Sequence, residues 1–138
     1  MRSIVLAAVA LSRWKEHILF TVPLSLLGGY LALEKTQVNL SQTTSLLIVT
    51  FANFLAVSYA FQINEIEDAG DDLATGRAGN VVSSRALSER AARFISIFTL
   101  AAALFLYFLV GNLSFYLGLT LILLGYLYSW KPIRLKAF

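Results

Sequence analysis

The chain is organised around residues 62–88, QINEIEDAGDDLATGRAGNVVSSRALS, the one long polar segment between apolar blocks that can each cross a bilayer. Five of the eight acidic residues fall within positions 65–72, directly after an apolar run. If that run continues as a helix, Asn64, Asp68 and Asp72 follow one another at four-residue intervals and share one face. A row of oxygen-bearing side chains suits a hard divalent cation.

The composition indicates an integral membrane protein. The chain has 138 residues, of which 58% are hydrophobic and 14% charged, and its mean hydropathy is +0.73. It contains no cysteine and one histidine, His17, which excludes disulfides, thiolate metal sites and multi-histidine zinc sites. The net charge of +3 is distributed between the apolar blocks rather than on one face. We therefore predict the lipid bilayer, and no nucleic acid, as a partner.

Four apolar blocks predict an all-α fold, a polytopic transmembrane helical bundle with four spans. The spans cover about residues 18–33, 45–63, 94–110 and 113–130, and the acidic loop covers 64–90. Only Gly111 and Asn112 separate the last two spans, which predicts an antiparallel helical hairpin.

Residues 1–12 have two interpretations. The apolar run resembles the core of a short signal peptide. Arg13, Lys15 and Glu16 follow it at once, and an amphipathic helix at the cytoplasmic surface explains the same pattern. We prefer the helix, because cleavage would place the later basic loops on the wrong side of the membrane.

The basic residues predict the orientation. Three Lys or Arg precede the first span, four lie between the second and third, three follow the fourth, and Lys35 alone lies on the other side. This bias predicts a multi-pass protein of the cytoplasmic membrane, with both termini and the acidic loop in the cytoplasm.

An acidic cluster at a membrane surface is often an ordinary solvated loop. Here the acids begin where the span ends, stand beside Asn64, and are followed by Arg77 and Arg85. Mg²⁺ is commonly bound by one or two carboxylates together with substrate phosphates, and arginine binds further phosphate oxygens. The stretch therefore predicts a magnesium and diphosphate site.

These residues carry a family resemblance. The run 64–72, NEIEDAGDD, resembles the first aspartate-rich motif of UbiA-type intramembrane prenyltransferases, Asn-Asp-x-x-Asp-x-x-x-Asp. Asn64, Asp68 and Asp72 match it, and Glu65 stands where the family usually has aspartate. Residues 79–88 are similar to the family's loop before its third helix, and 128–136, YSWKPIRLK, resembles its segment after the fourth. The resemblance covers nearly all of residues 1–138, which we therefore interpret as one domain.

The resemblance implies a Mg²⁺-dependent transfer of a prenyl group from a prenyl diphosphate to an aromatic or lipid acceptor. It implies that Asn64, Asp68 and Asp72 hold the metal, with Asp68 and Asp72 as the catalytic carboxylates. By the same analogy Tyr128, Arg134 and Lys136 contact the diphosphate. We add Arg77 and Arg85 as substrate-binding residues from their charge and proximity alone, and ordinary topology signals are the alternative.

The chain also departs from the family pattern. The resemblance implies nine transmembrane helices and a second aspartate-rich motif, yet no aspartate follows Asp72, and Glu89 is the one later acid. We expect the chain to be the N-terminal part of such an enzyme, with a missing C-terminal half and little transferase activity alone.

Two other classes of protein fit the hydropathy, a small four-helix transporter and a non-catalytic membrane subunit. The transporter is disfavoured because none of the four predicted spans contains a charged residue. Aromatic side chains of the second span are candidates for an apolar channel for the prenyl tail, or for plain packing: Phe51, Phe54, Tyr59 and Phe61.

Overall fold

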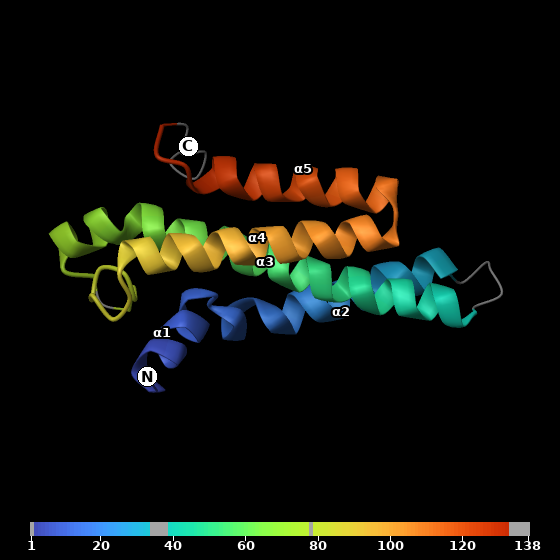
Figure 1. Ribbon diagram of the computed structural model, residues 1–138, viewed down its shortest axis with the longest axis horizontal. Coiled ribbons are helices and arrows are strands. Elements are labelled where there is room, and N and C mark those ends of the chain that lie inside the picture. The colour runs from blue at the N-terminus through green and yellow to red at the C-terminus, as the bar shows by residue number, and fades with distance from the viewer. Residues whose placement is uncertain (1, 34–38, 78, 133–138) are drawn as a thin grey trace.

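The computed structural model describes residues 2–33, 39–77 and 79–132, which form helices and their connections, with no strand in these ranges. The helices are α1 (Arg2–Leu11), α2 (Trp14–Leu33), α3 (Leu40–Thr75), α4 (Glu89–Val110) and α5 (Asn112–Ser129). Helices α2 to α5 are long and apolar enough to cross a membrane. The prediction of an all-α bundle with four such helices is confirmed (Figure 1).

Helix α3 is the centre of the bundle, because it packs against each of the other four helices. Its 36 residues span about 54 Å at roughly 1.5 Å per residue, more than the roughly 30 Å hydrocarbon core of a bilayer. One end of α3 must therefore extend beyond the apolar layer.

Both ends of α3 are fixed by local capping. Asn39 Oδ1 accepts a hydrogen bond from the Gln42 N–H (2.9 Å), and Gln42 Oε1 accepts one from the Asn39 N–H (3.0 Å). At the other end Gly76 takes a left-handed conformation, with φ of 68°, which favours glycine and ends a helix. Residues 64–75, which we predicted to begin the loop 64–90, are therefore helical.

The polar ends of the helices gather at one end of the bundle. Helix α1, the carboxyl ends of α3 and α5 and the start of α4 lie there, whereas the α4–α5 hairpin lies at the opposite end (Figure 1). Helix α1 projects at an angle from the bundle. Its Ala7 and Leu11 are buried against Ile66, Val82 and Leu87. The predicted lead-in helix and the antiparallel hairpin are both present.

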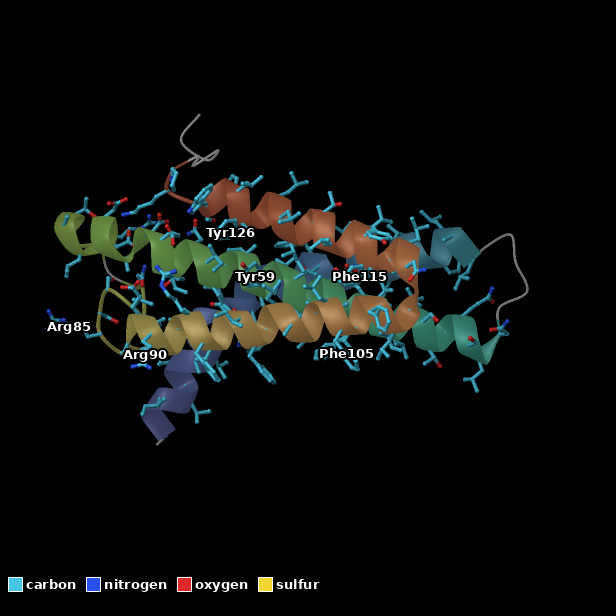
Figure 2. The ribbon with its side chains drawn as sticks, turned by 45° about the horizontal axis from the view of Figure 1, so that its top comes forward. Tyr59, Arg85, Arg90, Phe105, Phe115 and Tyr126 are labelled. Carbon is cyan, nitrogen blue, oxygen red and sulfur yellow. The ribbon has the colours of Figure 1, made fainter. Side chains whose placement is uncertain are left out.

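Small side chains let the helices of the bundle approach closely. Ala52, Ala56 and Ala103 are buried in its core together with Tyr107 and Ile122. Large apolar side chains point outward instead, and Figure 2 shows Phe105 among them. An outward apolar surface on a bundle with a partly polar interior fits lipid as the surrounding solvent.

A partly buried polar contact joins helices α2, α3 and α4. The Tyr107 hydroxyl of α4 donates to Asn53 Oδ1 of α3 at 2.6 Å, and Asn53 Nδ2 donates to Ser25 Oγ of α2 at 2.9 Å. Such contacts hold transmembrane helices together, because the alternative is an unsatisfied polar group in hydrocarbon. This contact also fixes the Tyr107 ring, which packs against Gly118 of α5.

Gly118 is predicted to be essential for the packing of α4 against α5. A Cβ atom at Gly118 would overlap the Tyr107 ring, which cannot move without breaking its hydrogen bond to Asn53. We expect Gly118→Ala to lower the free energy of unfolding by about 1–3 kcal/mol, measured by SDS titration of the protein in mixed micelles. Gly28→Ala is the matched control, because nothing lies within 4 Å of the position that its Cβ atom would occupy. Equal stability of the two variants would contradict this packing.

Candidate functional site

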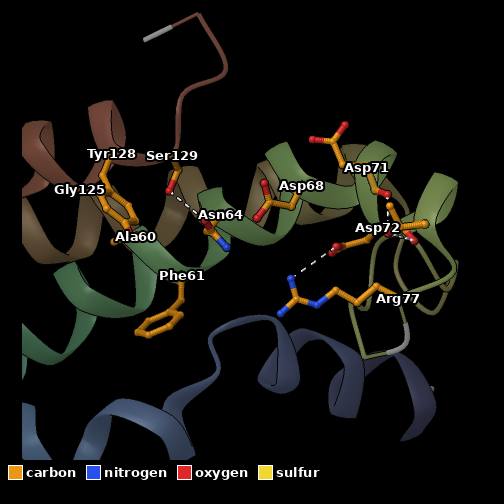
Figure 3. A pocket seen from close by; sticks show the side chains of 11 residues that line it. Ala60, Phe61, Asn64, Asp68, Asp71, Asp72, Arg77, Gly125, Tyr128 and Ser129 are labelled. Atoms are coloured by element: carbon orange, nitrogen blue, oxygen red, sulfur yellow. Dashed lines mark hydrogen bonds and ion pairs between the residues drawn. The ribbon is translucent and has the colours of Figure 1, made fainter. Parts of the chain in front are cut away.

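Helix α3 carries Asn64, Asp68 and Asp72 beyond the predicted apolar span on one face. Figure 3 shows the three side chains in succession along the helix, whereas Asp71 points away from them. All three line a cavity of about 770 Å³ between α3, the end of α5 and Arg77. The other residues that line this cavity are Ala60, Phe61, Asp71, Thr75, Arg77, Gly125, Tyr128 and Ser129.

A second cavity, of about 610 Å³, lies on the side of α1. It shares Asn64, Asp68, Asp72 and Arg77 with the first cavity. The row of polar side chains on α3, which we call the acidic face (Asn64, Asp68 and Asp72), therefore borders both cavities. The second cavity adds apolar and basic side chains from α1, the following turn and the start of α2: Leu6, Val9, Ala10, Arg13, Trp14 and Lys15.

The acids outside the acidic face form ion pairs that tie α3 to its neighbours. Glu65 lies 3.5 Å from Arg13, Glu67 lies 3.7 Å from Arg93, and Asp71 lies 3.5 Å from Lys131. These partners come from the α1–α2 turn, from α4 and from the turn after α5. Three of the five acids therefore pair with cations of neighbouring segments, and the other two, Asp68 and Asp72, border both cavities.

Asp72 has different partners for its two carboxylate oxygens. Oδ2 accepts a hydrogen bond from Asn80 Nδ2 at 2.9 Å, and Oδ1 lies 3.9 Å from Arg77 Nη1. The Asp72 side chain is 13% exposed and that of Arg77 is 74% exposed. The Arg77 guanidinium is thus held loosely, at the mouth of both cavities, where it can reach a bound anion.

Asn80 anchors the segment 79–88 to α3 and was not singled out by the sequence analysis. Its side chain is buried, and its Nδ2 donates to the Glu65 carbonyl at 2.8 Å as well as to Asp72. Its Oδ1 accepts from the N–H groups of Val82 (2.8 Å) and Ser83 (3.1 Å). The sequence signal was an asparagine after glycine, which is typical of a turn in which the side chain bonds the backbone.

Glu65 lies beside the acidic face and lines the second cavity but not the first. Its Oε2 accepts the Val81 N–H at 3.3 Å, and its Oε1 faces Arg13. Glu65 follows the predicted span 45–63, and burial raises the pKa of its carboxyl, an effect that Arg13 partly offsets. The longer side chain at this position thus reaches structural partners on two other segments.

Arg13 is a second residue that the sequence analysis treated only as a topology signal. It takes a left-handed conformation between α1 and α2, with φ of 47°. Its guanidinium pairs with Glu16, which raises the pKa of Arg13, and lies 5.3 Å from the centre of the Phe61 ring. Arg13 therefore connects the α1–α2 turn to the part of α3 that bears the acidic face.

The end of α5 also reaches the acidic face. Ser129 Oγ donates to Asn64 Oδ1 at 3.3 Å, and Tyr128 lines the first cavity. Tyr128 therefore lies at a cavity that the acidic face also borders. Arg134 and Lys136 lie outside the described residues.

Arg77 and Arg85, predicted together, lie in different places. Arg77 lines both cavities, but Arg85 lines neither. Arg85 has a positive φ of 59° and is exposed, and Figure 2 shows it at the outer tip of the loop. The backbone turn carries its side chain away from α3, so the prediction of a substrate contact at Arg85 is not supported by its position.

The four aromatic residues that were candidates for a prenyl-tail channel also lie in different environments. Phe61 lines the first cavity. Tyr59 is buried in the core, Phe54 packs against His17 with ring centres 5.1 Å apart, and Phe51 is exposed on the outer surface. Of these four aromatic residues, Tyr59 and Phe54 therefore pack inside the protein, Phe51 faces outward, and Phe61 alone borders the first cavity.

The chemistry of the acidic face fits a divalent cation that is shared with a ligand. In the ranges that the structure describes, no three His, Cys, Asp or Glu side chains form a closed metal site. The acidic face instead offers two carboxylates and an amide beside an open cavity. Mg²⁺ keeps several waters and takes one or two carboxylates plus substrate phosphates, so this partial set of ligands suits it.

Comparisons with known proteins identify the family. The sequence model of the UbiA prenyltransferase family matches residues 4–138, nearly the entire chain. Neither the curated proteins nor the solved structures contain a significant match.

Arg13 is predicted to stabilise the end of α3. The Glu65 carboxylate contacts Arg13 and the Val81 N–H. Arg13→Gln removes the first of these contacts, and water cannot easily replace it because Glu65 is buried. We expect the free energy of unfolding to fall by about 1–3 kcal/mol, as measured in detergent by SDS titration. Arg90→Gln removes the same charge at an exposed position on α4 and should change the stability by less than about 0.5 kcal/mol. Similar losses for both variants would disprove the role of Arg13.

Proposed function

Because the chain belongs to the UbiA prenyltransferase family, we propose that it takes part in transferring a prenyl group from a prenyl diphosphate to an aromatic or lipid acceptor in the membrane. The observation that carries this proposal is the acidic face, placed by the extension of α3 beside a cavity with a polar and an apolar part. We further propose Mg²⁺ as the cofactor.

The polar part of the first cavity is the proposed place of the diphosphate. Asn64, Asp68 and Asp72 would hold Mg²⁺ there. Mg²⁺, when bound, supplies positive charge that stabilises the departing diphosphate. Arg77, which is loosely paired with Asp72 and largely exposed, can turn its guanidinium toward the phosphate oxygens.

The chemistry of the transfer explains why cations are needed at this position. The bond between the first prenyl carbon and the diphosphate oxygen breaks, and its electron pair leaves with the diphosphate. A nucleophilic atom of the acceptor forms the new bond to that carbon and loses its proton. We propose that Arg77 and Tyr128, which both line the first cavity, favour the departing anion over the bound substrate. Arg134 and Lys136 stay predictions for the same role.

The apolar part of the cavity is the proposed entrance for the prenyl tail. Ala60, Phe61 and Gly125 line it on the side of the bundle core. Ala60 and Gly125 are small, and a Cβ at Gly125 would lie 3.1 Å from that of Ala60. At these two small residues α5 therefore lies close to α3, and we propose that the first carbons of the chain lie against the wall that they form.

The two carboxylates of the acidic face are predicted to control Mg²⁺-dependent binding. We expect Asp68→Asn and Asp72→Asn each to weaken the binding of a non-hydrolysable prenyl thiolodiphosphate by at least about tenfold, because each removes a charged metal ligand. Calorimetry on detergent-solubilised protein with and without Mg²⁺ measures this effect. Glu89→Gln is the matched control, because Glu89 lies on α4 outside both cavities and should bind like the wild type.

Equal affinity of the wild type and both aspartate variants would overturn the proposed site. So would binding that is unchanged when EDTA removes the divalent cation. A loss of affinity in Glu89→Gln equal to that in Asp68→Asn would mean that net charge, rather than the acidic face, governs binding.

The proposed orientation places the acidic face in the cytoplasm, and the cysteine-free chain allows a direct measurement. Ser41 and Ser84 are both exposed, one in the first turn of α3 and one in the loop beyond its end. In intact cells we expect a membrane-impermeant maleimide to label Ser41→Cys and not Ser84→Cys, and in inside-out vesicles the reverse. Labelling of Ser84→Cys in intact cells would contradict the orientation.

A further inference from the structure

We propose that Asn80 is the positioning residue of the candidate site, which holds Asp72 so that one carboxylate oxygen, Oδ1, faces the ligand. This inference rests on the proposed function and assigns a role to a residue outside the aspartate-rich run. The hydrogen bond from Asn80 Nδ2 to Asp72 Oδ2 carries it, at 2.9 Å and with the Asn80 side chain 4% exposed.

The orientation of the Asn80 amide is fixed by the backbone around it. Two backbone N–H groups, those of Val82 and Ser83, point at one end of the amide, which must therefore be the oxygen. The Glu65 carbonyl faces the other end, which must be the nitrogen. The second N–H of the same nitrogen then points at Asp72. All four hydrogen-bonding positions of the amide are used, which leaves it no alternative orientation.

This arrangement divides the two oxygens of Asp72 between two tasks. Oδ2 is held by Asn80, and Oδ1 is directed to Arg77 and the cavities. A carboxylate fixed at one oxygen presents the other in a single direction, so little rotamer freedom is lost when a cation binds. Asp72 is thus prepared as a ligand through one oxygen rather than through both.

The same side chain links the loop to the acidic face. The segment 79–88 bonds to α3 through Asn80 and through the Val81 N–H, which donates to Glu65. Val82 and Leu87 of this segment are buried against α1 and α3. The loop is therefore a support for Asp72, and its anchor on the polar side is Asn80.

The test measures the Mg²⁺ concentration at half-maximal binding of a prenyl thiolodiphosphate, in the full chain in detergent. We expect Asn80→Ala to raise this midpoint by about tenfold or more. Ser83→Ala is the matched control, because it removes only a hydroxyl bond to the Asn80 carbonyl in the same turn, and its midpoint should stay within about twofold of the wild type. An unchanged midpoint in Asn80→Ala would refute the inference.

A double-variant comparison separates positioning from general loosening of the loop. If Asn80 acts through Asp72, Asn80→Ala should shift the midpoint no further in a protein that already carries Asp72→Asn. Additive shifts would show that Asn80 acts independently of Asp72 and would overturn the inference. If Asn80→Ala fails to fold, Asn80→Ser replaces it, because the shorter hydroxyl can accept the Val82 or Ser83 N–H but cannot reach Asp72.

A readout without metal or ligand completes the test. Trypsin cleavage after Arg77 or Arg85 in the apo protein reports whether the loop is anchored, and we expect it to be faster in Asn80→Ala than in Ser83→Ala. Equal rates would count against the anchor. Failure of the proposed function has a different signature, since the wild type itself would then show no Mg²⁺-dependent binding.

Discussion

The candidate site depends on one constraint, the continuation of α3 as an unbroken helix past the end of its apolar part. A helix repeats its faces about every 3.6 residues, so one register places Asn64, Asp68 and Asp72 at both cavities and turns the other three acids of this stretch toward cations of neighbouring segments. Glu65, Glu67 and Asp71 meet Arg13, Arg93 and Lys131 there. A break in the helix at Asn64 would change the direction of all these side chains, so the two groups of acids would no longer lie on separate faces.

The rotation of α3 within the bundle decides which of its faces meets the cavities. That rotation is set within the apolar layer, where small residues such as Ala52 and Ala56 allow close approach and Asn53 bonds to Ser25 and Tyr107. These contacts lie several turns from the acidic face, yet a rigid helix transmits their orientation to it. The polar site is therefore positioned by packing inside the membrane layer, and the ion pairs at the end of α3 add to that orientation.

The sequence predicted the helical bundle and the row of Asn64, Asp68 and Asp72, because both follow from helical periodicity, whereas the role of Tyr128 was implied by the family resemblance alone. Whether the helix continues past Ile63 stayed open at the sequence level, because residues 64–75 are polar like a loop, and the structure ends α3 only at Gly76. The roles of Arg13 and Asn80 depend on contacts that no periodicity encodes. Arg77 lines both cavities and Arg85 lines neither, and the sequence could not distinguish them because the positive φ of Arg85 is not encoded by its residue type.

The proposed binding of a divalent cation at the acidic face of α3 can be located directly by cleavage of the backbone. Replacing Mg²⁺ by Fe²⁺ in the presence of ascorbate and peroxide cuts the backbone next to the bound ion, and mass spectrometry of the fragments locates it. We expect cuts within residues 64–72 and near Asn80, which excess Mg²⁺ with a prenyl thiolodiphosphate suppresses and Asp68→Asn abolishes. Cuts elsewhere in the chain, or cuts at α3 that persist in Asp68→Asn, would contradict the proposed binding.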